Sequence, residues 1–316
     1  MDSRHPLLVV AGPTASGKTA LAVELARRLN GEIISGDSMQ VYAPLQIGTA
    51  RPTEEEMGGI PHHLLGFLPL DAAYSVAQYT ADAHAAIAAV EGRGHLPILC
   101  GGTGLYIQAV TEDLTFPEQA GDPALRARLK ERALDEGGSV LLEELRGIDP
   151  DTAARLHPND IGRIVRALEV YEETGEPMSR RDRRGRQRPD RYEAVYIGLS
   201  FRDREDLRER IDRRVDEMVR RGLLQEVQAL LDGGLPRDAT ALQAIGYKQF
   251  LAVADGTATA EQAVEEGKLR SRQYAKRQLT WLRRNPAIHW IYWDKEPDFP
   301  AALQNATDFL TAHGLG

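Results

Sequence analysis

The sequence has little cysteine and no long apolar run. Cys100 is the single cysteine among 316 residues, so an internal disulfide is excluded and a reducing, cytoplasmic location is expected. No stretch of about 18 apolar residues occurs, which argues against a membrane-spanning helix, and the apolar "LLVVA" near the start is too short for a signal peptide. No repeat of roughly 20 to 50 residues is visible. Disulfide-stapled, membrane-bound and solenoid proteins are therefore not expected.

Positive charge is also in short supply. The 39 basic residues are outnumbered by 47 acidic ones, which gives a net charge of -8. A nucleic-acid site would therefore need local basic segments. Two exist: residues 268–284 carry seven basic residues and no acid, and residues 179–191 carry seven arginines and two aspartates. They predict contact with a phosphate backbone, although the arginine run also fits a mobile, solvated loop that orders on binding.

A phosphate-binding motif lies near the start of the chain. The stretch "GPTASGKT" has the spacing G-x-x-x-x-G-K-[ST] and stands between a short apolar, β-branched segment and a helical pattern. In such loops backbone N–H groups and the positive end of the next helix converge on an anion, while the Thr hydroxyl can bind Mg²⁺. The sequence predicts a phosphate site made by Gly12, Pro13, Thr14, Ala15, Ser16, Gly17, Lys18 and Thr19. The motif alone does not name the ligand.

Strand and helix signals alternate on both sides of this loop. Strands are expected at "PLLVVAG", "EIISGDS", "LPILCGGTG" with a buried Cys100, "EAVYIGLSF" and "AIHWIYWD". The helix after the phosphate loop should stop at Gly31, a second should be capped by Ser75, and a long one should run from about Arg204 to Leu231. Alternation of this kind indicates an α/β fold with a P-loop NTPase-like parallel sheet flanked by helices.

Residues 117–189 interrupt the alternation with mainly helical signals such as "PALRARLKERALDE" and "IGRIVRALEVYEETG". We therefore predict a discontinuous core, residues 1–118 and 193–316, and a mainly helical insertion domain, residues 119–192.

Polar groups follow two of the expected strands, at the edge where open parallel sheets place their ligand sites. Asp37 could hold magnesium-bound water or act as a general base, but a turn or cap residue is an equal alternative. Thr103 in "CGGTGLY" offers a hydroxyl, with a tight turn as the alternative. The adjacent His62 and His63 point in different directions and lack a neighbouring ligand cluster, so structural roles are expected. Trp281, in the apolar trio "LTWL", is expected in the core rather than stacked on RNA.

Ten segments in a fixed order make the chain similar to the bacterial tRNA dimethylallyltransferases, also called tRNA isopentenyltransferases. The resemblance runs from about residue 8 to residue 284. The segments are "GPTASGKT", "DSMQVY", "IGTARP", "GIPHHLL", "YSVAQY", "GGTGLY", "RIVRALEVYEETGEP", "GLLQEV", "AIGYKQ" and "YAKRQLTWLRR". The resemblance implies transfer of a dimethylallyl group from dimethylallyl diphosphate to N6 of the adenosine 3′ of the anticodon, in tRNAs that read codons beginning with U. The phosphate loop would then hold a diphosphate leaving group, with Mg²⁺, rather than ATP.

The resemblance also implies roles for single residues. Asp37 becomes the expected base, Thr103 the residue that orients the amine, and Thr19 the magnesium ligand. Arg210 and Arg214 become the candidates for reaching the diphosphate, with Arg214 as a catalytic residue. Contacts with the flipped base and the anticodon stem-loop are implied for Asp37, Ser38, Met39, Gln40, Thr103, Arg163, Arg166, Lys276 and Arg277. A monomer is expected.

Three positions depart from the family pattern, and two other functions fit parts of the sequence. Gly162, Gln78 and Gly66 stand where relatives often have glutamine, an acid and aspartate, respectively. This leaves open whether an ion binds near Gln78 and which contact is made at Gly162.

A small-molecule kinase would explain the loop and fold but not the basic segments. A non-catalytic RNA-binding ATPase would leave Asp37 and "GGTGLY" without a role.

Overall fold

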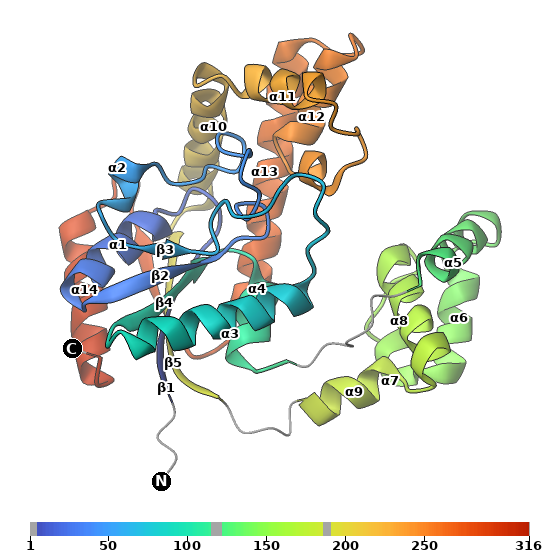
Figure 1. Ribbon diagram of the computed structural model, residues 1–316, viewed down its shortest axis with the longest axis horizontal. Helices are drawn as coiled ribbons and strands as arrows, with labels where there is room; N and C mark the ends of the chain where they lie inside the picture. Colours follow the sequence, from blue (N-terminus) through green and yellow to red (C-terminus); the bar gives the residue numbers. More distant parts are fainter. Residues whose placement is uncertain (1–4, 115–121, 186–190, 316) are drawn as a thin grey trace. The chain divides into compact units, whose positions relative to one another are not determined.

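The structure, a computed structural model, describes residues 5–114, 122–185 and 191–315. The chain divides into two compact units (Figure 1): unit 1 comprises residues 1–111 and 191–316, and unit 2 comprises residues 112–190. The sequence analysis placed the two junctions after residues 118 and 192, whereas the two units divide after residues 111 and 190. In the described residues, no helix combines the length and the apolar character needed to cross a membrane.

Unit 1 is built on a parallel sheet of six strands in the order β3-β2-β4-β1-β5-β6. The strands are β1 (His5–Ala11), β2 (Gly31–Gly36), β3 (His62–His63), β4 (Leu96–Gly101), β5 (Tyr192–Phe201) and β6 (Ile288–Trp293). Leu7 to Ala11 are fully buried because helices cover both faces of the sheet, which is why β1 reads as an unbroken apolar run. The parallel α/β core and its five expected strands are confirmed. The two-residue β3 was not predicted.

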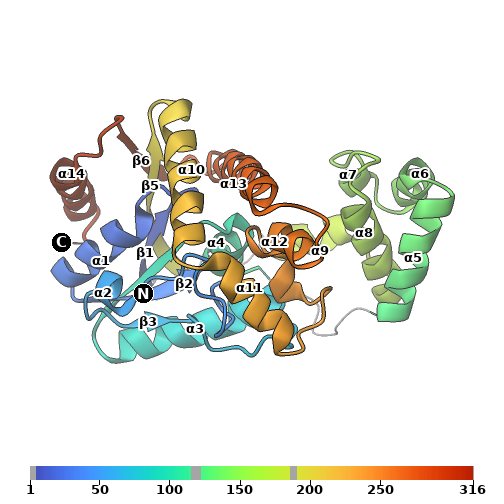
Figure 2. The same ribbon diagram turned by 90° about the horizontal axis from the view of Figure 1, so that it is seen from above.

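Helices cover the sheet on both faces (Figures 1 and 2). The helices of unit 1 are α1 (Lys18–Arg28), α2 (Glu54–Met57), α3 (Val76–Gly92), α4 (Gly104–Thr111), α10 (Arg204–Arg220), α11 (Leu223–Asp232), α12 (Tyr247–Ala254), α13 (Ala260–Leu282) and α14 (Phe299–Ala312), with a 3₁₀ turn at Thr240–Gln243. Apolar residues of α1, α10 and α14 share one core with the sheet, and those of α3 and α4 share a second. A third core joins α11, α12 and α13 to the loop after β2.

The structure corrects two predicted helix ends. The helix α1 ends at Arg28, and the chain turns at Asn30 with φ 50°, whereas Gly31 is the first residue of β2. A Cβ on Gly31 would lie 2.9 Å from the carbonyl oxygen of Leu96, so this glycine serves the close approach of β2 and β4. The long helix expected to reach Leu231 breaks at Gly222, whose φ of 99° favours glycine and starts α11. The predicted cap is confirmed: Ser75 caps α3 and accepts the N–H of Gln78.

Unit 2 is helical in all of its described elements. They are α5 (Pro123–Asp135), α6 (Gly138–Ile148), α7 (Pro150–Ala153), α8 (Ile161–Thr174) and α9 (Met178–Gly185). Leu129, Leu141, Leu145 and Ile164 are fully buried in its core. The arginine run, for which a mobile loop was an alternative, begins as the helix α9; residues 186–190 lie outside the described residues.

Candidate functional site

Three loops meet at the carboxyl edge of the sheet in unit 1. The phosphate loop follows β1, residues 37–40 follow β2, and residues 102–103 follow β4. These strands are neighbours, with Ala11 and Gly36 both in register with Gly101 of β4. The predicted groups therefore lie at one edge because adjacent parallel strands end together.

The phosphate loop has the geometry of an anion site at only some of its positions. Ala15 and Gly17 have φ of 63° and 85°, the left-handed conformation that allows successive N–H groups of a loop to converge on an anion. In the described part of the chain, no protein group accepts the N–H of Ala15, Gly17, Lys18 or Thr19. Two other N–H groups are occupied: that of Thr14 donates to Gln278 Oε1 at 2.9 Å, and that of Ser16 to the carbonyl of Pro13 at 3.3 Å. Pro13 has no N–H to offer, so the N–H groups of Ala15, Gly17, Lys18 and Thr19 are the ones available to an anion.

The loop is held by two side chains that the sequence analysis did not select. Trp293, the last residue of β6, donates its indole N–H to the carbonyl of Ser16 at 2.7 Å. Gln278 of α13 accepts from Thr14 and donates to the carbonyl of Gly102 at 3.0 Å. Ser16 Oγ is buried without a partner in the described residues, so a hydrogen-bonding group remains free inside the loop. The motif "YAKRQLTWLRR" was the available signal for Gln278.

Cations surround this loop without matching acids. The Lys18 ammonium donates to the carbonyl of Pro13 at 3.3 Å, and burial lowers its pKa; Cys100 and Asp37 raise it and Arg214 lowers it. Burial likewise lowers the pKa of Arg214, against the charge of Asp37. Arg210 lies over the ring of Phe201 at 5.8 Å, and burial lowers its pKa too. Within the described residues none of the three cations has an ion pair. Partly dehydrated cations of this kind are suited to a multiply charged anion.

Asp37 fits both of the interpretations left open for it. Its Oδ1 accepts the N–H of Met39 at 2.9 Å, which is a turn contact. Its charge also acts on Lys18, Arg214 and the hydroxyl of Tyr274, so the carboxylate lies among the groups of the site. The turn contact fixes the carboxylate and leaves its second oxygen available to a substrate.

Thr103 and Gln40 are tied into the loops around Asp37. Thr103 Oγ accepts the N–H of Ser38 at 3.3 Å, and it lies near the hydroxyl of Tyr274, whose pKa burial raises and Thr103 lowers. The Gln40 amide donates to the carbonyls of Thr49 and Ala50 at 3.1 and 3.2 Å. Gln40 therefore shapes the loop that follows β2.

A second carboxylate, Glu226 of α11, organises the neighbouring loop and was also missed. It accepts the N–H groups of residues 46, 47 and 48 at 3.0 to 3.3 Å. The hydroxyl of Tyr247 bonds to the same carboxylate and accepts the N–H of Gly48 at 3.1 Å. A Cβ on Gly48 would lie 2.4 Å from that tyrosine ring, so "IGTARP", "GLLQEV" and "AIGYKQ" form one contact.

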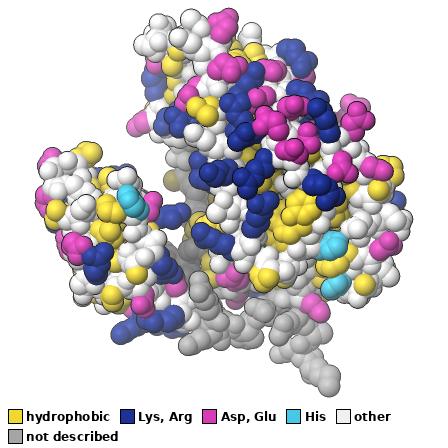
Figure 3. Space-filling model, turned by 180° about the vertical axis from the view of Figure 1, so that it is seen from behind, with side chains coloured by type: hydrophobic (Ala, Val, Ile, Leu, Met, Phe, Trp, Pro, Cys, Tyr) yellow, Lys and Arg dark blue, Asp and Glu magenta, His cyan; other side chains and the backbone are white. Residues whose placement is uncertain are grey.

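The C-terminal basic segment is only partly available to a ligand. Three of its cations are paired with acids: Lys268 with Asp216 at 2.8 Å, Arg272 with Asp212 at 2.6 Å, and Arg270 with Glu266. The other four, without an ion pair in the described part of the chain, are Lys276, Arg277, Arg283 and Arg284. Lys and Arg side chains gather on the face of unit 1 in Figure 3.

Aromatic rings support this segment from within. Arg277 lies over Tyr274 and Arg284 over Trp281, at 5.7 and 5.6 Å. Trp281 also packs against Gly104, where a Cβ would come within 2.1 Å of the indole. Trp281 is only half-buried and belongs to none of the four core clusters, so the core position expected of it is wrong, although its ring packs against the chain at Gly104.

Some arginines of unit 2 form ion pairs with acids, and others form none among the described residues. Arg163 is exposed, whereas Arg166 bonds at 2.8 Å to Glu169, a fully buried carboxylate. Arg166 therefore has a structural partner, which weakens its assignment as an RNA contact. In α9, Arg183 and Arg184 pair with Asp151 and Glu176, while Arg180 and Arg181 have no ion pair among the described residues.

The three departures from the family pattern have local explanations. Gln78 completes the capping box of α3 by accepting from Ser75, which accounts for its side chain without an ion. Gly66 has φ of 60°, and a Cβ there would lie 2.1 Å from the guanidinium of Arg51. Gly162 is exposed with open space around it.

The residues present fit a magnesium ion that a diphosphate and water would complete. The Thr19 hydroxyl stands at the start of α1, half-buried, and has no hydrogen-bond partner in the described residues. Those residues contain no cluster of three acidic, His or Cys side chains able to hold a metal by themselves. Mg²⁺ commonly binds through one or two protein oxygens together with substrate phosphates.

Known proteins resemble this chain over nearly its full length. A sequence model of the IPP transferase family matches residues 40–285. A tRNA dimethylallyltransferase of Bacillus subtilis (strain 168) is 46% identical over 313 residues, 99% of this chain and 98% of that protein. The tRNA isopentenylpyrophosphate transferase structure from Bacillus halodurans is 41% identical, with a TM-score of 0.74 over 98% of this chain and 96% of that one. A eukaryotic dimethylallyltransferase acting on tRNA is 30% identical, with a TM-score of 0.81 over 98% and 80%.

Proposed function

This chain belongs to the IPP transferase family, and we propose that it transfers a dimethylallyl group from dimethylallyl diphosphate to the N6 amine of an adenosine in tRNA. The adenosine is the one immediately 3′ of the anticodon, in tRNAs that read codons beginning with U. One observation carries the proposal: cations without an ion pair in the described residues, loop N–H groups without an acceptor there, and the Asp37 carboxylate all lie at one edge of the sheet.

The diphosphate half of the site needs positive groups that act when the leaving group departs. Cleavage of the allylic C–O bond places charge on the diphosphate. The N–H groups of Ala15 and Gly17, the ammonium of Lys18 and the guanidinium of Arg214 are available for that charge. Mg²⁺ held at Thr19 would neutralise further charge on the diphosphate.

The acceptor half needs a base because the lone pair of the adenine amine is delocalised into the ring. Asp37, fixed through Met39, would take the proton from the amine. Thr103 would orient the amine with its hydroxyl. The target base must leave the anticodon loop stack to reach these groups, as in other enzymes that modify bases.

The tRNA would be held by cations that lack an acidic partner in the described residues. Among such cations we assign to this role Lys276, Arg277, Arg283 and Arg284 of unit 1 and Arg163, Arg180 and Arg181 of unit 2. A single chain supplies every group in this proposal, so a monomer suffices for activity.

A label-transfer assay tests the proposal. The protein is incubated with Mg²⁺ and radiolabelled dimethylallyl diphosphate, together with unmodified tRNA or, in parallel reactions, with AMP or ATP. The digested tRNA and the free nucleotides are analysed by mass spectrometry. An adenosine next to the anticodon that carries one added C₅H₈ unit supports the proposal. Alkylation of free adenine nucleotides alone would keep the chemistry and reject the tRNA substrate. Consumption of ATP without any alkylation would favour a small-molecule kinase.

A further inference from the structure

One side chain, Gln278 of α13, joins the two glycine-rich loops of the site. Its amide is buried, accepts the N–H of Thr14 at 2.9 Å and donates to the carbonyl of Gly102 at 3.0 Å. Thr14 belongs to the loop proposed for the diphosphate, and Gly102 precedes Thr103 in the loop proposed for the adenine amine. A single amide therefore sets the spacing between the two halves of the site.

The helix α13 packs closely against these loops at two glycines. A Cβ on Gly102 would lie 2.3 Å from Gln278 Nε2 and 2.9 Å from the carbonyl oxygen of Gly12. A Cβ on Gly104 would lie 2.1 Å from Trp281 of the same helix. These glycines allow the helix and both loops to touch directly, so a displacement of the amide moves both loops.

The network continues to the residue next to Asp37. Tyr274 lies one turn before Gln278, and its hydroxyl lies near Gln278 and Thr103: burial raises the pKa of this hydroxyl, and both neighbours lower it. Thr103 in turn accepts the N–H of Ser38 at 3.3 Å. Two hydrogen bonds of Gln278, the peptide link from Gly102 to Thr103 and the bond from Ser38 to Thr103 thus connect the phosphate loop and α13 to the segment that carries the carboxylate.

A simpler interpretation is that Gln278 only satisfies two buried backbone groups. That role would affect how much protein folds, but not the turnover of the molecules that do fold. The placement of its two partners in different halves of the site favours an effect on turnover itself, since misplacement of reacting groups by about 1 Å can cost about a hundredfold in rate.

We infer that Gln278 is a positioning residue for group transfer, assisted by Tyr274, and that it holds the phosphate loop and the Thr103 loop in register. The inference rests on the proposed function. Neither residue touches the reacting atoms in this arrangement; both act through the loops that do.

Steady-state kinetics of three variants test the inference. Gln278→Leu removes both amide bonds, and Tyr274→Phe removes only the hydroxyl and keeps the ring under Arg277. Gln273→Leu is the matched control, because Gln273 is an exposed glutamine on the same helix. The turnover number and the KM for dimethylallyl diphosphate are measured with saturating tRNA, and rates are normalised to the folded fraction from thermal melts.

The expected result is a kcat lowered about a hundredfold in Gln278→Leu and about tenfold in Tyr274→Phe, which removes a polar neighbour of Gln278 and Thr103 but keeps both amide bonds. KM should change much less than kcat, since a positioning contact acts on the transition state. Gln273→Leu should match the wild type. If Gln278→Leu does not fold, Gln278→Glu decides the question, because its carboxylate still accepts the N–H of Thr14 and loses only the donation to the carbonyl of Gly102.

Two outcomes would overturn the inference. The first is a kcat per folded molecule within twofold of wild type for the folded variants, and the second is an increase in KM with kcat unchanged. A wild-type protein that transfers no label would instead reject the proposed function, together with the inference that rests on it.

Discussion

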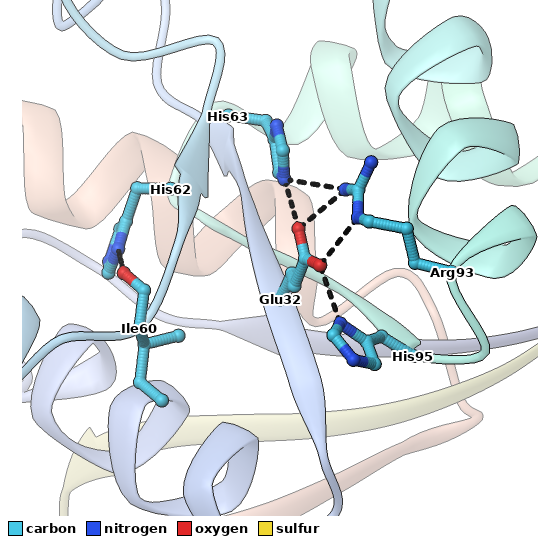
Figure 4. Close-up of polar contacts among 6 residues, drawn as sticks. All are labelled: Glu32, Ile60, His62, His63, Arg93 and His95. Carbon is cyan, nitrogen blue, oxygen red and sulfur yellow. Dashed lines mark hydrogen bonds and ion pairs between the residues drawn. The ribbon is translucent and has the colours of Figure 1, made fainter.

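A carboxylate lies near each end of β2, and the two differ in their bonding partners. At the amino edge Glu32 is almost fully buried and is bonded by three cationic or titratable groups (Figure 4): Arg93 at 2.6 and 2.9 Å, His63 at 2.6 Å and His95 at 2.6 Å. At the carboxyl edge Asp37 has only a backbone contact to Met39, although Lys18 and Arg214 feel its charge.

The difference separates a structural charge from one available to a ligand. Bonds from Arg93, His63 and His95 outweigh the cost of burial and lower the pKa of Glu32 to about 2. Every acceptor of that carboxylate is used inside the protein. Asp37, Lys18 and Arg214, by contrast, form no ion pair within the described residues. They remain available to a charged substrate, at some cost in the free energy of unfolding.

The largest expected effect comes from Asp37. Replacement by Ala should lower the transfer rate about a thousandfold, in the range of a lost general base, while tRNA affinity changes little. Asp37→Asn is the matched control, because its Oδ1 can still accept the N–H of Met39. If Asn restored near wild-type transfer, Asp37 would be a turn residue only, and the contrast with Glu32 would fail. Single-turnover rates and filter binding measure the two quantities.

Arg214 comes next. Arg214→Met should lower kcat about a hundredfold through the loss of one charge that stabilises the departing diphosphate. Arg213→Met is the control, because Arg213 is exposed on the same helix and donates only to the carbonyl of Glu209. Equal activity of the two variants would show that burial of Arg214 beside Asp37 has no catalytic meaning.

Glu32→Gln should leave kcat unchanged and reduce the free energy of unfolding by about 2 kcal/mol at neutral pH. A pKa lowered from 4.5 to about 2 corresponds to about 3 kcal/mol, reduced here because Arg93 is half exposed. Because the folded-state pKa is the lower one, the contribution is complete above pH about 4.5 and disappears as the pH falls toward 2. Urea titrations of wild type and variant across this range measure it.

The control for that measurement is Glu193→Gln, at an exposed position of β5. This variant should leave the free energy of unfolding unchanged across the same pH range. A loss of transfer activity in Glu32→Gln with stability intact would contradict the assignment of the amino edge as structural.

The smallest effect is expected for the unpaired arginines of unit 2. Replacing Arg180 and Arg181 by Gln should weaken tRNA binding and reduce the slope of log K against log salt by about one for each phosphate that the variant no longer neutralises. Arg128→Gln is the paired counterpart, because Arg128 is bonded to Glu172 at 3.0 Å. The two variants should differ in slope; an identical slope for both would show that ion pairing does not decide which cations meet the RNA.

Local signals predicted much of the fold. The five longer strands, the phosphate loop before α1 and the cap at Ser75 follow from patterns within about ten residues of each feature. The errors also have local causes. Asn30 took the turn expected of Gly31, and Gly222 broke a helix whose apolar spacing continues on both sides. An isolated glycine inside a helical pattern was the usable warning at Gly222.

The sequence by itself determined the chemistry that is available. It contains the phosphate loop, the residues that follow the strand ends and the ordered motifs of the family, since each is a short run whose meaning depends on neighbours along the chain. Only the tertiary structure decided which groups are already used. Thr14 meets Gln278 across 264 residues, Ser16 meets Trp293 across 277, and the 46–48 loop meets Glu226 across about 180. Hydrogen-bond partners and burial at such separations are set by packing, so whether a charge is free for a substrate appears only once the chain has folded.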